Sequence, residues 1–162
     1  MTLVCESDLV ALSNMDVKST SPVASPDGKE KKSVTFSTSP PMSVYLLAFA
    51  VGEFVYCGNE DFRVPIRVYS TIDKAINQGQ YAADLTARCL SFFEDKFKIA
   101  IPVPKMDGLA LADKQGAMEN LGLVTYAEAS ILYDPDLTPL SRKAALSSTI
   151  VSRDAHSRAN DH

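Results

Sequence analysis

The sequence has few cysteines and few histidines, and it has no long apolar run. Its three cysteines are an odd number at irregular spacing, which indicates reduced thiols in an intracellular protein rather than a disulfide framework (Cys5, Cys57 and Cys89). The longest apolar run, residues 44–52, is far shorter than the roughly 20 residues that a membrane helix needs. Acidic residues interrupt the N-terminal segment, which excludes a signal peptide. We therefore expect a soluble, cytoplasmic protein that makes no contact with a membrane.

An excess of positive charge is also missing. The 16 Lys and Arg residues against 20 Asp and Glu residues give a formal net charge of −4 and an isoelectric point of about 5.1. The chain therefore lacks the excess of positive charge that nucleic-acid-binding proteins use to bind phosphates, and we expect no nucleic-acid partner. The composition, 46% hydrophobic and 22% charged, is that of an ordinary globular chain. The two histidines, His156 and His162, limit any His-based metal site.

The first 58 residues show the patterns of β-strands and no helical periodicity. We predict two short strands within residues 1–15, a strand at 33–37 and a longer strand at 43–56. Residues 18–32 are rich in serine, proline and charge, and they predict a solvated loop at the tip of a hairpin. Its predicted turn is Pro26-Asp27-Gly28.

Residues 59–146 mix helical and strand patterns, which makes the predicted fold class α+β. Apolar residues recur every four positions from Tyr81 to Phe97 and predict an amphipathic helix of about 18 residues whose aromatic stripe packs in the core. Residues 62–69 predict a strand that Pro65 places at a sheet edge or a bulge.

The C-terminal third adds short elements and a polar tail. Further strands are predicted at 105–111 and 123–126, on either side of a turn at Gly116. From Leu140 a helix of about two turns is expected. Residues 147–162 have low apolar content and mixed charge, which predicts a disordered tail.

One segment carries candidate chemistry: Gly116, Ala117, Met118, Glu119 and Asn120, followed by the sequence Gly-Leu-Val-Thr-Tyr. Taken alone, it is a glycine turn that opens an exposed strand, with a solvated carboxylate at Glu119. The pentapeptide resembles the exopeptidase signature of the aminopeptidase N family of zinc metallopeptidases, the gluzincin aminopeptidases. Residues 41–54 and 102–107 stand in the order that this family shows, and the pattern is most similar to cytosolic puromycin-sensitive and fungal alanine/arginine aminopeptidases.

The resemblance implies both a fold and a function. Residues 1–58 would be the last strands of the family's N-terminal β-sandwich domain, and residues 59–146 the start of a thermolysin-like catalytic domain. The parent activity is the release of N-terminal amino acids from peptides by zinc-activated water. Glu119 would hold the free α-ammonium group of the peptide, because a carboxylate and an ammonium form a charge-assisted hydrogen bond. Gly116, Ala117 and Met118 would line the substrate, and Asn120 would brace the turn.

The sequence departs from the family at the expected zinc site. The family carries H-E-x-x-H on a helix, which places two imidazoles one turn apart with a glutamate as general base. Residues 152–156 occupy that position here and are Ser-Arg-Asp-Ala-His. Arg153 therefore stands where the base should be, and we predict no catalytic residue and no zinc bound to this chain. His156 and His162, with Asp154 and Asp161, could provide only a weak adventitious site.

Several alternatives remain open at this point. The chain is either a fragment of a zinc aminopeptidase without activity, a non-catalytic binder of peptide amino termini, or a scaffold that reuses the fold. The tail is either an out-of-frame ending or a degenerate zinc helix. Two further departures from the family lie near Glu119. Leu121 stands where the family usually has tryptophan, and the segment that directly precedes Gly116 is one residue shorter than usual. The sequence predicts no oligomeric state.

Overall fold

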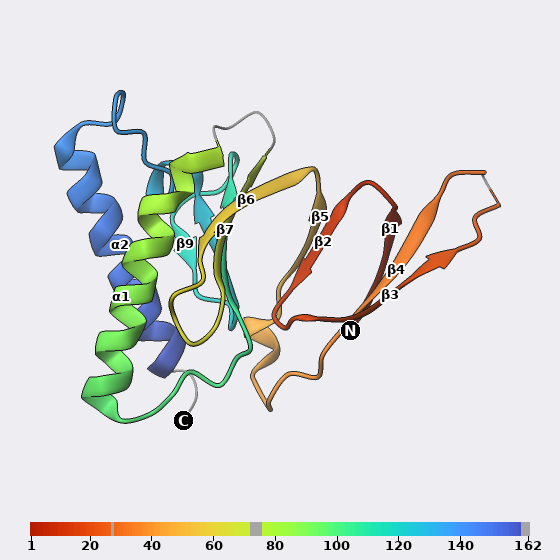
Figure 1. Cartoon of the computed structure of the whole chain (residues 1–162), viewed down its shortest axis with the longest axis horizontal. Helices are drawn as coiled ribbons and strands as arrows, with labels where there is room; N and C mark the ends of the chain where they lie inside the picture. The colour runs from red at the N-terminus through yellow and green to blue at the C-terminus, as the bar shows by residue number, and fades with distance from the viewer. Residues whose placement is uncertain (27, 72–75, 160–162) are drawn as a thin grey trace.

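The structure, a computed structural model, describes residues 1–26, 28–71 and 76–159. Its N-terminal part is rich in β-structure and holds a three-stranded antiparallel sheet in the order β1-β4-β3, beside a ribbon in which β2 pairs with β5 (Figure 1). The elements are β1 (Thr2–Glu6), β2 (Val10–Ser13), β3 (Val17–Val23), β4 (Lys31–Phe36), the 3-10 helix η1 (Val44–Leu46) and β5 (Phe49–Gly52). Figure 1 shows the three-stranded sheet reaching away from the rest of the molecule.

The second part is a five-stranded mixed sheet in the order β6-β7-β8-β10-β9. The inner strands β7, β8 and β10 run parallel, and the outer strands β6 and β9 pair antiparallel with their neighbours. Helices α1 and α2 lie together on one side of this sheet (Figure 1). The elements are β6 (Phe54–Asn59), β7 (Ile66–Thr71), η2 (Ile76–Gly79), α1 (Gln80–Phe97), β8 (Met106–Leu111), β9 (Ala117–Met118), β10 (Leu123–Ala127), η3 (Glu128–Ser130) and α2 (Leu140–Ala159). The predicted α+β class is confirmed.

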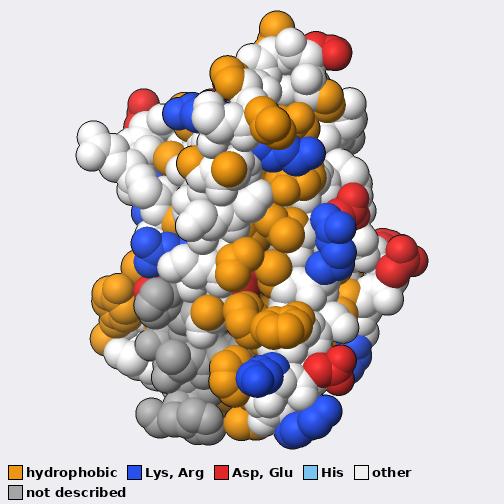
Figure 2. All heavy atoms as spheres, turned by 90° about the vertical axis from the view of Figure 1, so that its left-hand side faces the viewer, with side chains coloured by type: hydrophobic (Ala, Val, Ile, Leu, Met, Phe, Trp, Pro, Cys, Tyr) orange, Lys and Arg blue, Asp and Glu red, His pale blue; other side chains and the backbone are white. Residues whose placement is uncertain are grey.

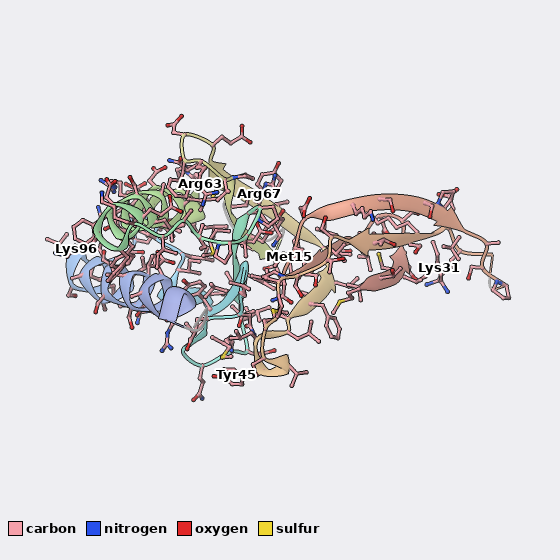
Figure 3. All side chains as sticks on the ribbon, turned by 90° about the horizontal axis from the view of Figure 1, so that it is seen from below. Met15, Lys31, Tyr45, Arg63, Arg67 and Lys96 are labelled. Atoms are coloured by element: carbon pink, nitrogen blue, oxygen red, sulfur yellow. The ribbon has the colours of Figure 1, made fainter. Side chains whose placement is uncertain are left out.

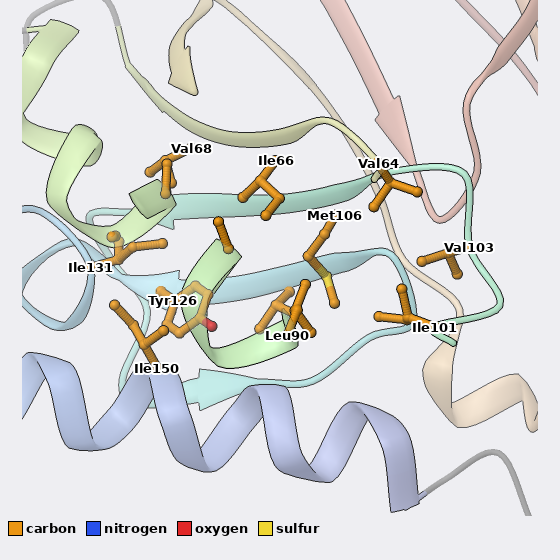
Figure 4. Packing of buried hydrophobic residues seen from close by; sticks show 14 of the residues in the cluster. Val64, Ile66, Val68, Leu90, Ile101, Val103, Met106, Tyr126, Ile131 and Ile150 are labelled. Atoms are coloured by element: carbon orange, nitrogen blue, oxygen red, sulfur yellow. The ribbon is translucent and has the colours of Figure 1, made fainter. Parts of the chain in front are cut away.

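The five-stranded sheet is buried on both faces because successive side chains of a strand alternate between them. On the helix side, the core joins Ile66, Met106 and Tyr126 of the sheet to Leu90 of α1 and Ile150 of α2 (Figure 4). On the other side, a second cluster joins the sheet to the N-terminal part through Leu12, Tyr69, Leu109 and Leu123. The two parts of the chain therefore share an apolar interface.

Helix α1 lies where it was predicted, but the prediction that its aromatic stripe packs in the core is wrong for Phe92 and Phe97; Tyr81, at the start of the stripe, does pack against the core. Its buried residues are Ala82, Ala83, Thr86, Ala87 and Leu90. Phe92 and Phe97 are 62% and 57% exposed. The small residues let the helix axis approach the sheet closely, and the larger rings are left at the rim or in solvent. Viewed from the helix side, hydrophobic side chains gather in a strip on the surface (Figure 2).

Three predictions for the strands also need correction. Residues 43–56 are not one strand, because the 3-10 helix η1 interrupts them and the hydroxyl of Ser43 accepts a hydrogen bond from the N–H of Tyr45. Residues 18–23, predicted as part of a loop, belong to β3, which pairs with β4. Pro65 does not mark an edge strand: it precedes β7, which has a neighbour on each side. The predicted hairpin tip is found, although Asp27 lies outside the described residues.

Helix α2 is much longer than the two predicted turns, and the expectation of disorder is wrong for residues 147–159. Leu146, Ile150 and Asp154 lie four residues apart on one face and are 2%, 0% and 1% exposed. The burial of this face against α1 and the sheet orders the helix. Residues 160–162 lie outside the described part of the chain. In that part, no helix is both long and apolar enough to cross a membrane.

The predicted domain boundary at residue 58 stays a prediction. Strand β6 spans this position and pairs along its whole length with β7. The five-stranded sheet therefore begins at Phe54.

Candidate functional site

The predicted site residues lie on a short strand at the edge of the five-stranded sheet. Gly116 has a φ of +66°, which favours glycine, and its carbonyl accepts a hydrogen bond from the N–H of Ala127 at 2.7 Å. Ala117 and Met118 form β9 and pair with Tyr126 and Thr125 of β10. Because β9 is the last strand of the sheet, its outer backbone groups face away from every described strand. Such an edge can accept a further strand.

A tight turn follows the strand and fixes its exit. The N–H of Leu123 donates to the carbonyl of Asn120 at 3.1 Å, and Gly122 takes a φ of +72°. The side chains of Asn120 and Leu121 are buried. The side-chain amide of Asn14 donates at 2.8 Å to the carbonyls of both Leu121 and Leu46, which ties this turn to the N-terminal part.

The carboxylate of Glu119 is held in an ion pair with α2. Nη1 of Arg153 donates to Oε2 of Glu119 at 2.8 Å, and the two side chains are 31% and 13% exposed. Glu119 directly follows β9, and its contact with Arg153 places its carboxylate on the helix side of the sheet, where α2 lies. Glu119 is therefore not the solvated surface carboxylate that the segment alone indicated.

A buried acidic group stands beside this ion pair on α2. Asp154 is 1% exposed. Burial raises the pKa of the Tyr126 hydroxyl well above its usual range, and the negative charge of Asp154 raises it further. Burial, followed by the same charge, raises the pKa of the half-buried Cys89 thiol to about 11. Tyr126 and Cys89 therefore remain protonated at neutral pH.

Ser152 and Arg153, two of the residues at the expected zinc site, do not fit zinc. Arg153 has no lone pair to offer a metal, and its guanidinium already faces Glu119. Ser152 is exposed, and Asp154 is buried on the inner face of α2. Within the described residues, no three His, Cys, Asp or Glu side chains gather as a metal site. The side chains of His156, Asp161 and His162, the candidates for an adventitious site, lie outside the described residues.

A buried ion pair that sequence analysis missed supports the site from the other face of the sheet. Nζ of Lys105 lies 2.8 Å from Oδ2 of Asp107 and donates to the carbonyls of Ser13 and Gly122 at 2.8 and 2.7 Å. Burial lowers the pKa of Lys105 and raises the pKa of Asp107, and the opposite charge of each partner counteracts the shift. The available signal was the Lys-x-Asp spacing, which places both side chains on one face of a strand.

A cavity of about 280 Å³ lies beside this pair, where the N-terminal part meets the sheet. Met15 and Arg67, both labelled in Figure 3, line it together with Lys105 and Asp107. The three cysteines are all free, as predicted.

Comparison with known proteins places this geometry in a family. A family model described as the peptidase family M1 domain matches residues 81–159. The puromycin-sensitive aminopeptidase of Caenorhabditis elegans is 46% identical over 158 residues, which cover 96% of this chain and 16% of the relative. The alanine/arginine aminopeptidase of Saccharomyces cerevisiae is 46% identical over 157 residues, which cover 96% of this chain and 18% of the relative. The chain belongs to the aminopeptidase N family, peptidase family M1.

Membership of family M1 confirms the resemblance seen in the sequence. Aminopeptidase N of Bos taurus is a further relative, 42% identical over 163 residues, with 96% of this chain and 16% of the relative covered. The M1 match includes both Glu119 and Arg153, and it ends at Ala159, the last residue of α2. The chain thus spans about one sixth of the length of these M1 relatives.

Proposed function

We propose that this chain is a segment of an M1 metallo-aminopeptidase that keeps the strand for binding a peptide amino terminus and has no catalytic activity as it stands. The observation that carries the proposal is the position of Glu119, directly after the edge strand β9 and with its carboxylate holding a cation. An extended peptide adds to the open edge of β9 by main-chain hydrogen bonds. Its α-ammonium group then meets the carboxylate of Glu119.

Each residue of the signature has a proposed role in this arrangement. Gly116, Ala117 and Met118 offer backbone groups to the peptide, and the exposed, side-chain-free Gly116 lets the peptide backbone approach closely. Asn120 braces the turn through its carbonyl. We place the protein in the cytoplasm because its three thiols are free.

The proposed lack of catalysis rests on the chemistry of α2. M1 enzymes use zinc bound by H-E-x-x-H, and Ser152 and Arg153 replace the first histidine and the glutamate of that motif. A guanidinium cannot accept a proton from water, so Arg153 cannot act as a general base. No step of a zinc mechanism is therefore assigned to this chain.

A zinc titration tests this assignment. The double variant Ser152→His/Arg153→Glu, in which residues 152–156 become H-E-D-A-H, is expected to bind zinc at least about tenfold more tightly than the wild-type chain in calorimetry. Val151→His/Arg153→Glu is the matched control, because its histidine is not four residues from His156. Tight binding of one zinc ion by the wild-type chain would contradict the proposal. An equal gain of zinc affinity in the control variant would show that residues 152–156 do not stand at the position of the H-E-x-x-H motif.

The alternative is that capture of peptide amino termini is the function of this chain itself, and not a remnant of the parent enzyme; the open edge of β9 favours it. It requires peptide affinity that is lost in Glu119→Gln, and the complete absence of affinity would end it. A scaffold without a peptide site would instead show a defined partner or oligomer and no dependence on Glu119.

A further inference from the structure

We propose that Arg153 closes the amine-binding site of this chain, by occupying the carboxylate of Glu119 with a cation of its own. The inference rests on the proposed function, which gives Glu119 to the ammonium group of a peptide. The peptide must then displace a guanidinium that is covalently part of the same chain. Arg153 thereby sets the affinity of the site.

The geometry of the ion pair supports an internal occupant. Nη1 of Arg153 lies 2.8 Å from Oε2 of Glu119, the distance of a charge-assisted hydrogen bond. The Glu119 side chain is only 13% exposed, so water screens the pair less than it screens a surface pair. Nε of Arg153 is buried and finds no hydrogen-bond partner among the described residues, so the contact with Glu119 is a main polar anchor of this guanidinium.

The packing of α2 places Arg153 next to the carboxylate of Glu119. Ile150 and Asp154, which flank Arg153 along the helix, are 0% and 1% exposed. The backbone of α2 is therefore fixed against the core, and the backbone position of Arg153 relative to Glu119 is fixed with it. A peptide can remove Arg153 from Glu119 by changing the side-chain rotamer, without undocking the helix.

The charges explain why both cations cannot share the site. The carboxylate of Glu119 is already paired with the positive charge of Arg153. An ammonium group added beside the pair would lie next to a like charge, which is unfavourable in a partly desolvated site.

Calorimetric titration with the amide of tri-alanine, which has a free amino terminus, tests the proposal on the whole chain. Arg153→Met is expected to bind this peptide about tenfold more tightly than the wild-type chain, because no half-buried ion pair must be broken first. Arg142→Met is the matched control: it removes the same charge from an exposed position of the same helix and is expected to leave the affinity unchanged. Acetylation of the peptide is expected to abolish binding to every variant.

The outcomes separate this inference from the proposed function. Equal affinity of the wild-type chain and Arg153→Met overturns the inference and leaves the amine site in place. Absence of binding to both overturns the amine site, and with it the inference. Circular dichroism checks that the variants fold, and Arg153→Gln, which is neutral but still polar, replaces the methionine variant if that variant is unfolded. Adding Glu119→Gln to the Arg153→Met variant is expected to remove the gain in peptide affinity.

Discussion

The variant Lys105→Met is expected to lower the free energy of unfolding by about 3–5 kcal/mol, the cost of leaving one member of a buried ion pair without its partner. Lys105 is 4% and Asp107 1% exposed, so the remaining carboxylate would lie in the core without its hydrogen-bonded countercharge, and Arg67 would be the remaining positive charge that acts on it. The carbonyls of Ser13 and Gly122 would also lose a donor. Urea unfolding of the purified chain, followed by circular dichroism, measures the change.

Two further variants make this result specific. Lys105→Met/Asp107→Leu removes both charges and is expected to be more stable than the single variant, because no unpaired charge remains buried. Lys98→Met removes the lysine of an exposed pair in which Nζ lies 3.9 Å from Oδ1 of Asp95, and it is expected to change stability by less than about 0.5 kcal/mol. If Lys105→Met were as mild as Lys98→Met, the buried pair would not support the fold as described.

The variant Gly122→Ala is expected to cost about 3 kcal/mol, the sum of a left-handed backbone penalty and a forced shift of a neighbouring segment. Gly122 has a φ of +72°, and a Cβ placed there would overlap the backbone oxygen of Asn14. The segment around Asn14 would have to move away from the signature turn. The same urea experiment measures the loss.

Gly116→Ala provides the matched control for this variant. Gly116 has a similar φ of +66°, but a Cβ there would meet nothing within 4 Å. Its expected cost is only the backbone penalty of about 1 kcal/mol. Equal losses in the two variants would mean that the contact between the turn and Asn14 is not tight.

The elements that the sequence predicted well are those whose patterns depend on local chemistry. Helix α1 was placed by its four-residue period and its following prolines, and the turn at Gly116 by its glycine. The burial of Ala83, Thr86 and Ala87 on α1 was not predicted, because small residues are less prominent in the pattern than the aromatic residues at the rim of the helix.

Elements held by long-range contacts were missed. The side chains of β3 are almost all exposed, so its strand depends on backbone pairing with β4, which leaves no hydrophobic pattern. Helix α2 was cut short because Asp154 interrupts an apolar stripe that begins with Leu146 and Ile150. A buried carboxylate has the same sequence signature as a solvated one.

The candidate site shows the same division. Glu119 was selected from its motif, and Arg153 was noticed as the residue at the position of the general base. Their ion pair could not be predicted, because it requires the length and packing of α2, which the sequence pattern concealed. Whether the signature residues bind a peptide stays a prediction.

The measurement that tests the central claim most directly is the release of alanine from the amide of tri-alanine by the purified wild-type chain supplied with zinc. Because the chain is proposed to keep the M1 signature strand without a catalytic centre, we expect no release above the rate without protein. Release that a chelator abolishes and that Glu119→Gln removes would contradict it.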